Sequence, residues 1–179
     1  MPLYSLVAWP PAALADWLGR QQARLGLAAY GPPHLNVRTP FEWDGTEGAL
    51  HAQVEASLRG LPAFEARLAG WRRFPHTIFL EVELTGGLRT AHARALDLPG
   101  APAGPRDGEG YIPHLTLALG LLTWAEDDTW REVQRLRPPL KTWRVDELAL
   151  TLERPGTLDE VRRFGLAAPV SDSAGKRRK

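Results

Sequence analysis

The spacing of apolar residues predicts a chain in which strands and helices alternate. Short apolar or alternating runs bounded by proline and glycine predict strands, and apolar residues at intervals of three or four predict helices. The expected strands cover residues 4–9, 34–43, 64–68, 77–82, 112–121, 143–152 and 161–166. The expected helices cover residues 11–25, 50–58, 85–96 and 123–136, and a capping box of Thr123 and Glu126 opens the last one. This order favours an α+β protein, or an α/β protein, with helices packed on sheets.

Composition indicates one soluble domain with a substantial core. Of the 179 residues, 44% are hydrophobic and 24% are charged, and the longest apolar stretches are too short to cross a bilayer. Only the proline- and glycine-rich stretch 98–110 resembles a linker, so we expect one domain over residues 1–166. Residues 167–179 are expected to form a basic, disordered tail. The N-terminus lacks the features of a signal peptide, so we expect a cytoplasmic protein, and nothing requires more than a monomer.

Charge and cysteine content exclude several function classes. The formal net charge of +1 excludes a protein that coats nucleic acid through bulk charge, although it leaves room for a local basic surface. The absence of cysteine excludes disulfides, thiol nucleophiles and cysteine-based metal sites.

A short internal repeat carries the candidate chemistry. The sequence PHLNV at residues 33–37 recurs as PHLTL at residues 113–117, a separation of 80 residues. Each copy opens an expected strand after a turn, and an expected helix follows each strand. Two copies in equivalent places suggest an old duplication with a pseudo-twofold relation.

Strand geometry explains why this spacing matters. Successive side chains of a strand point to opposite faces, so His34 shares a face with Asn36, and His114 shares one with Thr116. The leucines between them face the other way and are expected to pack against helices. The Asn amide and the Thr hydroxyl can donate hydrogen bonds to a phosphoryl oxygen, and Arg38, two residues further along, is expected to add a positive charge on the same face.

Two imidazoles that face one phosphate have an evident use. A neutral imidazole takes a proton from the attacking group, and a protonated one gives a proton to the leaving oxygen. Positioning and charge stabilisation then suffice for phosphoryl transfer without a metal ion. The sequence contains no HxxxH or HExxH pattern and no acidic triad, which leaves the metal-site alternative weak, and it has no GxxxxGK[ST] loop, so we expect no metal, cofactor or ATP.

The paired motifs resemble those of the two-histidine (2H) phosphoesterases, a group that includes the 2′-5′ RNA ligases and the RNA 2′,3′-cyclic phosphodiesterases. The resemblance covers residues 4–166. It implies a bilobal fold in which each of two pseudo-symmetric lobes has an antiparallel sheet flanked by helices, with the active groove between the lobes. It also implies metal-free opening of a 2′,3′-cyclic phosphate to a 2′-phosphate, and some members reversibly join or cleave 2′-5′ linkages in RNA.

The resemblance also assigns roles to residues of the two motifs. His34 would be the proton donor, His114 the base that activates water, and Thr116 the hydroxyl of the second motif. Asn36 departs from the usual Thr or Ser, so we expect altered efficiency or substrate preference.

A second departure follows the second motif. Many relatives carry a basic residue there, but this chain has Ala-Leu-Gly at residues 118–120. The positive charge would then come from Arg38, Arg72 or Arg73.

The other histidines and two aromatic residues have competing interpretations. His92 lies on an apolar helical stripe and is expected to be a core residue, and His51 is expected on a helix surface. His76 fails the motif but remains a candidate for lining the groove. Trp71, expected in a turn, and Tyr111, just ahead of the second motif, are candidates for stacking on a nucleobase, and core packing is the alternative for both.

The leading hypothesis is an RNA-processing phosphodiesterase whose partners are RNA or oligonucleotide ends with a 2′,3′-cyclic phosphate. The alternative, motivated by Asn36, is a nucleotide- or RNA-end-binding module with weak or no catalysis. A third hypothesis, reversible 2′-5′ ligation, shares the same site. The sequence does not choose among mononucleotide, oligonucleotide, tRNA and 2′-5′ oligoadenylate substrates.

Overall fold

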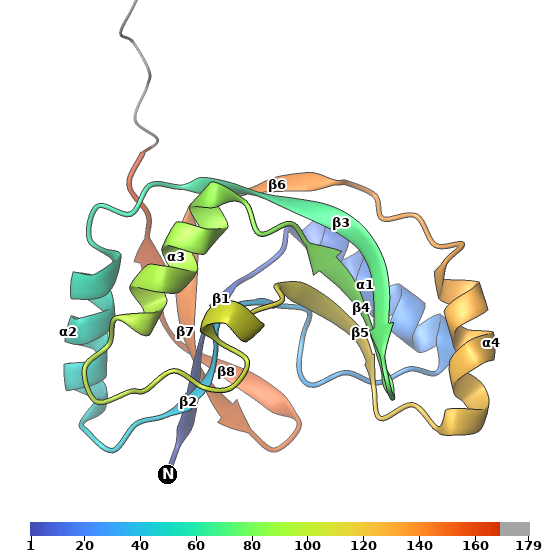
Figure 1. Cartoon of the computed structure of the whole chain (residues 1–179), viewed down its shortest axis with the longest axis horizontal. Coiled ribbons are helices and arrows are strands. Elements are labelled where there is room, and N and C mark those ends of the chain that lie inside the picture. Colours follow the sequence, from blue (N-terminus) through green and yellow to red (C-terminus); the bar gives the residue numbers. More distant parts are fainter. Residues whose placement is uncertain (169–179) are drawn as a thin grey trace, which may run out of the picture.

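A computed structural model describes residues 1–168 and confirms the α+β class (Figure 1). Its strands are β1 Leu3–Ala8, β2 Leu35–Glu42, β3 Phe64–Phe74, β4 Thr77–Val82, β5 His114–Leu119, β6 Thr142–Val145, β7 Glu147–Arg154 and β8 Thr157–Gly165. Its helices are α1 Ala12–Leu25, α2 Glu47–Leu58, α3 Gly86–Leu96, α4 Thr123–Val133 and the short 3₁₀ turn η1 Gly108–Gly110. The order of elements follows the apolar pattern of the sequence.

The strands form one eight-stranded sheet in the order β6-β3-β4-β5-β2-β1-β7-β8, and all neighbouring strands are antiparallel. At the centre of this order, β2 and β5 are joined through a single residue pair, Leu35 and Leu115. The sheet therefore consists of two four-stranded halves, β6-β3-β4-β5 and β2-β1-β7-β8. The family resemblance implies an antiparallel sheet in each of two lobes, and the structure joins the two half-sheets through this one pair.

Two helices cross from one half of the sheet to the other. Helix α1 follows β1 along the chain but packs against β5, and α3 follows β4 but packs mainly against β2, with a smaller contact to β3. The two crossings are equivalent, since β1 and β4 are the neighbours of the two motif strands. Each half of the fold is thus covered by a helix that starts from the other half (Figure 1).

The main core lies on the helix-covered side of the sheet. The apolar residues of the two motifs are fully buried there, as the alternation predicts; they are Leu35, Val37, Leu115 and Leu117. They pack in one cluster with the apolar positions of the two crossing helices, which include Leu14, Leu18, Leu88 and Ala91. Burial of this face fixes the direction of the opposite face, which carries the histidines.

Strand β3 is longer than the sequence predicts. It continues through residues 70–73, which are expected to form a turn, as far as Phe74. The turn occurs instead at Pro75 and His76, where His76 has a φ of 62°. The expected strand 143–152 is also divided at Asp146. Its first part pairs with β3 and its second part with β1, in opposite halves of the sheet.

The prediction that Thr123 and Glu126 form a capping box at the start of α4 is wrong. Leu122 is the N-cap, without a side-chain hydrogen bond, and Thr123 is already helical. Glu126 instead accepts a hydrogen bond from the backbone N–H of His76 at 2.8 Å. The carboxylate therefore ties α4 to the β3–β4 turn.

The end of the described chain is attached to the body of the protein. Ala167, expected to begin the tail, donates to Leu61 O at 2.8 Å and accepts from Ala63 N at 2.9 Å. The rest of the expected tail, residues 169–179, lies outside the described residues. Within residues 1–168, no helix combines the length and the apolar character that crossing a bilayer requires.

Candidate functional site

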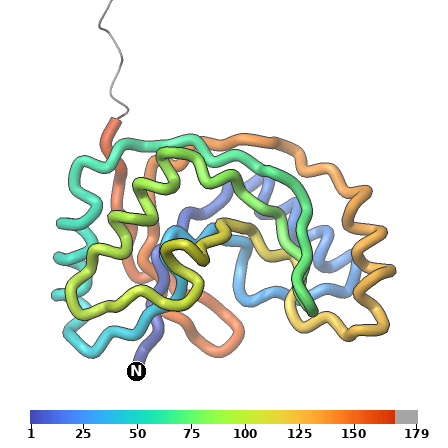
Figure 2. The backbone as a smooth tube through the Cα atoms, in the orientation of Figure 1, coloured from blue at the N-terminus to red at the C-terminus, as the bar shows by residue number. Residues whose placement is uncertain are grey.

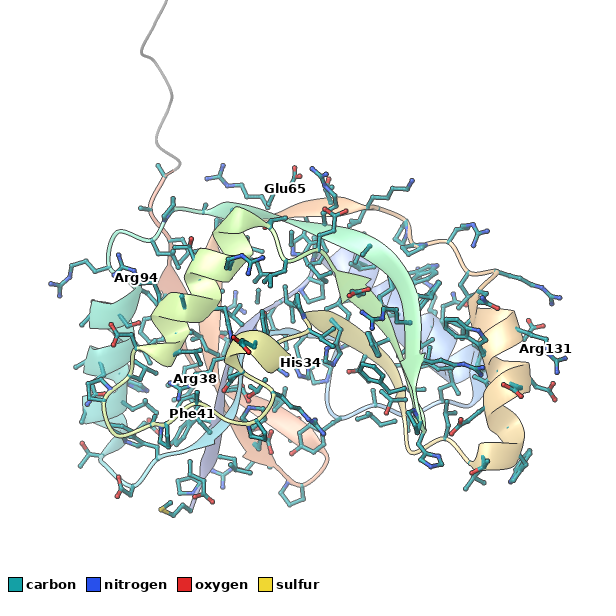
Figure 3. The ribbon with its side chains drawn as sticks, in the orientation of Figure 1. His34, Arg38, Phe41, Glu65, Arg94 and Arg131 are labelled. Atoms are coloured by element: carbon teal, nitrogen blue, oxygen red, sulfur yellow. The ribbon has the colours of Figure 1, made fainter. Side chains whose placement is uncertain are left out.

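The pairing of Leu35 with Leu115 brings the two motifs together. In an antiparallel pair the flanking residues also lie opposite each other, so His34 lies across from Thr116, and Asn36 lies across from His114. All four side chains occupy the side of the sheet opposite the two leucines. We call this side the histidine face. His34 lies at the middle of the molecule, between the two halves (Figure 3).

The two imidazoles are held by the same local hydrogen bond. Nδ1 of His34 lies 2.7 Å from the carbonyl oxygen of Pro32, and Nδ1 of His114 lies 2.7 Å from that of Ile112. A carbonyl oxygen only accepts, so each Nδ1 carries a hydrogen and each Nε2 is left to exchange a proton with a substrate. A proline precedes each histidine and favours an extended conformation of the residue before it, which supplies the accepting carbonyl.

Burial controls the protonation of both histidines. Burial lowers the pKa of His34, its hydrogen bond to Pro32 raises the pKa in part, and the charge of His114 lowers it further. Burial also lowers the pKa of His114, with a partial opposing effect of the Ile112 carbonyl. The two imidazoles therefore resist double protonation, as an acid–base pair requires.

Two charged residues act on His114 in opposite directions. The guanidinium of Arg106 lowers the pKa of His114, and the carboxylate of Glu81 raises it. Glu81 lies across from His114 in the β4–β5 register and forms an ion pair with Arg72 at 2.6 Å.

Both motif strands contain a bulge at the same position. In β2, Asn36 pairs with Val7 and Arg38 pairs with Leu6, which leaves Val37 as the extra residue. In β5, Thr116 and Ala118 pair with neighbouring residues of β4, so Leu117 is the extra residue. A bulge interrupts the alternation of side chains, so the residue after it no longer shares a face with the histidine.

The carbonyl groups of the two bulge residues are bound by the two crossing helices. His92 Nδ1 of α3 donates to Val37 O at 2.7 Å, and Gln22 Nε2 of α1 donates to Leu117 O at 3.1 Å. The other ring nitrogen of His92 accepts from Gly108 N at 3.0 Å. His92 is thus a buried, fully hydrogen-bonded core residue, as the sequence predicts.

The prediction that Arg38 faces the phosphate is wrong. Its side chain has no exposed surface, and it donates to Ala95 O at 2.8 Å, to Pro102 O at 3.2 Å and to Ala101 O. The guanidinium also lies 4.1 Å from the centre of the Phe41 ring. The bulge at Val37 turns Arg38 to the helix side, where it fastens the segment after α3 (Figure 3).

The two residues expected to stack on a nucleobase, Tyr111 and Trp71, instead pack against other side chains of the protein. The Tyr111 ring is buried and stacks on His92 at 3.7 Å between ring centres, and its hydroxyl donates to Asn36 O at 2.7 Å. Trp71 pairs with Leu80, which pairs with Leu115, so it lies on the helix side of the sheet. There it packs against Trp17 of α1. Neither ring is available to a ligand on the histidine face.

The remaining candidates divide between the two sides of the sheet. His76 lies in the β3–β4 turn, where its Nδ1 contacts Leu121 O at 2.7 Å, and it does not reach the histidine pair. Arg73 is on the helix side and pairs with Asp127 of α4 at 2.7 Å, whereas Arg72 is on the histidine face. His51, expected on a helix surface, lies on α2 but is half-buried.

Two aromatic residues that sequence reasoning missed lie beside the histidines. The Phe79 ring is 4.8 Å from the His114 ring, and the Trp9 ring is 6.3 Å from the His34 ring. Trp9 also donates from Nε1 to Glu160 at 2.7 Å. Phe79 is recognised as a site residue by its position on β4 opposite Thr116, and this position is known only from the strand register.

Arg106 is a further residue that the sequence did not single out. The Asp107 carboxylate beside it accepts from the backbone N–H and the hydroxyl of Thr39, at 3.2 and 2.8 Å, and from Gly104 N at 2.9 Å. These bonds fasten the segment before β5 to β2, which it crosses (Figure 2). Arg106 is exposed and has no ion pair within residues 1–168. Its charge is therefore available to an anion near His114.

Within the described residues, no group of three or more His, Asp or Glu side chains is arranged to hold a metal ion. The chemistry that this face offers comes from two imidazoles, a hydroxyl, an amide and the Arg72–Glu81 ion pair, and the positive charge of Arg106 acts on His114. These groups can exchange protons and bind an anion.

Comparison with protein families decides the relationship. The model of the 2′-5′ RNA ligase superfamily matches residues 9–156. The chain belongs to this superfamily, and hence to the 2H phosphoesterases. This confirms the resemblance that the paired motifs indicate.

Solved structures of the superfamily share the fold at low sequence identity. TT0787 of Thermus thermophilus is 21% identical, with a TM-score of 0.62 over 94% of this chain and 100% of that chain. E. coli LigT in complex with 3′-AMP is 15% identical, with a TM-score of 0.60 over 92% of this chain and 98% of that chain. Usb1 of Kluyveromyces marxianus is 11% identical, with a TM-score of 0.50 over 92% and 97%. No curated protein sequence matches the chain.

The opposing charges around His114 predict opposite effects of two substitutions. Arg106→Gln removes a positive neighbour and should raise the pKa of His114, and Glu81→Gln removes a negative one and should lower it. An NMR titration of the histidine ring signals measures both shifts. Arg131→Gln, on the exposed face of α4, is the control and should leave the titration unchanged. Shifts in the same direction for the first two variants would contradict this electrostatic arrangement.

Proposed function

We propose that the protein is a metal-independent RNA 2′,3′-cyclic phosphodiesterase that opens the cyclic phosphate to a 2′-phosphate. One observation carries this proposal, namely that the β2–β5 pairing places His34 and His114 diagonally on one face with both Nδ1 atoms engaged. Each Nε2 is then directed to the ligand side as an acid or a base. The superfamily relationship supports this reaction class.

The two histidines divide the proton transfers. His114 Nε2 takes a proton from water as the water oxygen bonds to phosphorus, and the phosphorus–O3′ bond breaks on the opposite side. His34 Nε2 gives its proton to the departing O3′, so the product carries a 2′-phosphate and a 3′-hydroxyl. The lowered pKa of His114 keeps this base neutral at neutral pH. The anionic phosphate favours the protonated form of His34.

Three other residues stabilise the phosphate. The Thr116 hydroxyl and the Asn36 amide lie across from His34 and His114 and donate to the non-bridging oxygens. Arg106 supplies the positive charge that the sequence lacks after the second motif and that the buried Arg38 cannot supply. E. coli LigT has been solved in complex with 3′-AMP and with ATP, which fits a nucleotide phosphate at this position.

The alternative function is a module that binds a nucleotide or RNA end with weak or no catalysis. Asn36 favours this alternative, because it replaces the usual hydroxyl of the first motif. The Oδ1 atom of Asn36 is also buried without a hydrogen-bond partner among the described residues. Reversible 2′-5′ ligation uses the same residues, with a ribose hydroxyl in the place of water.

Removal of either histidine tests the proposal. His34→Ala and His114→Ala should each lower turnover of a 2′,3′-cyclic nucleotide by about 100-fold or more, since each removes one proton transfer. Analysis of the product should show the 2′-phosphate, and EDTA should leave the rate unchanged. His76→Ala, which removes a histidine of the β3–β4 turn, is the matched control. Binding without product by the unmodified protein would favour the binding module.

The Asn36 departure has its own test. Asn36→Thr restores the hydroxyl that is usual in the first motif and should retain or improve turnover, because either group donates to the phosphate. Steady-state kinetics on the same substrate measures the effect. A tenfold loss would show that the amide has a separate role at this position.

A further inference from the structure

The histidine face continues beyond the histidines to an exposed aromatic ring. Phe74, the last residue of β3, is 45% exposed, and its ring lies 5.1 Å from that of Phe79. Phe79 is almost fully buried and lies 4.8 Å from the His114 ring. Three rings thus form a row that leads from the imidazole to solvent, and only the last has a large exposed surface.

The strand register places Arg72 on the same face as Phe74. Arg72 pairs with Phe79, which pairs with Thr116, so all three lie on the side of the catalytic pair. The guanidinium carbon is 5.7 Å from the centre of the Phe74 ring, and the Glu81 carboxylate holds the group at 2.6 Å. The Arg72 side chain remains 45% exposed, so it can meet a further anion.

An exposed ring beside a guanidinium suits one class of ligand. Nucleobases stack on aromatic rings, and arginine binds the phosphates between nucleotides. Leu119, which is 43% exposed, lies on the same face two strands from Phe74, with Thr77 between them. Phe74 is linked to the site by ring packing through the buried Phe79, which favours a part of the substrate over a separate partner.

We propose that Phe74 and Arg72 form a platform for the nucleotide next to the cyclised one. The base of that nucleotide stacks on Phe74, and the phosphate that links it to the cyclised nucleotide approaches Arg72. The buried Phe79 ring separates His114 from the platform, so the cyclised nucleotide lies between the imidazole and Phe74. The preferred substrate is therefore a single-stranded RNA end of two or more nucleotides. This inference rests on the proposed function.

Kinetics on two substrates of different length test the platform. The substrates are adenosine 2′,3′-cyclic phosphate and the dinucleotide ApA that ends in a 2′,3′-cyclic phosphate. The unmodified protein should have the higher kcat/KM for the dinucleotide. In Phe74→Ala the ratio of kcat/KM for dinucleotide to mononucleotide should fall about tenfold, through a higher KM. Arg72→Gln should also lower this ratio and weaken its dependence on salt.

Matched variants separate stacking from general effects. Phe74→Tyr keeps an aromatic ring and should keep the dinucleotide-to-mononucleotide ratio of kcat/KM at the level of the unmodified protein. Phe74→Leu keeps an apolar side chain without a π face and should lower this ratio as Phe74→Ala does. Trp124→Ala removes an aromatic residue of α4 that is 80% exposed and should not change the ratio. A ratio that stays constant in Phe74→Ala, or falls equally in Trp124→Ala, would overturn the platform.

Failure of the platform and failure of the proposed function give different results. If the unmodified protein turns over neither substrate, the proposed function fails. Anisotropy of fluorescently labelled ApA that ends in a 2′-phosphate then decides the platform by binding alone. Weaker binding by Phe74→Ala but not by Phe74→Tyr supports it, and equal binding by all three proteins overturns it.

Discussion

The site depends on one antiparallel residue pair. Leu35 and Leu115 join the two halves of the sheet, and their side chains are buried beneath the helices. Because neighbours in an antiparallel pair alternate between faces, burial of these leucines obliges the flanking polar residues to face the other way. A His and a hydrogen-bond donor from each half therefore meet across the pair. Neither half could form this arrangement alone.

The structure around the pair holds both motifs in the same way. Each imidazole is bound by the carbonyl two residues earlier, and each bulge carbonyl is bound by a helix that crosses from the other half. The segment before β5 is tied to β2 through Asp107, and it carries Arg106 to the neighbourhood of His114. This rigidity matters because phosphoryl transfer depends mainly on positioned donors and charge.

The alternation of side chains along a strand predicted that His34 shares a face with Asn36, and His114 with Thr116. This prediction needs no tertiary information, because it depends only on residues two positions apart. The alternation failed at Arg38, because the bulge at Val37 reverses it one residue later, and no sequence signal marks this bulge. Trp71 was misplaced because β3 continues past Gly70 into a longer hairpin. The stacking of Tyr111 on His92 and the position of Arg106 follow from the path of a loop, which the packing of the whole chain determines. The exposure of Phe74 depends likewise on where the hairpin ends.

The proposed reaction requires that His34 and His114 act on the same phosphorus atom. Histidine ring ¹⁵N spectra recorded during a titration with adenosine 2′-phosphate test it most directly. We expect Nε2 of both residues to shift with one dissociation constant, while His92, whose ring nitrogens are both bound within the protein, does not respond. A response of only one of the two residues, or different dissociation constants for them, would contradict it.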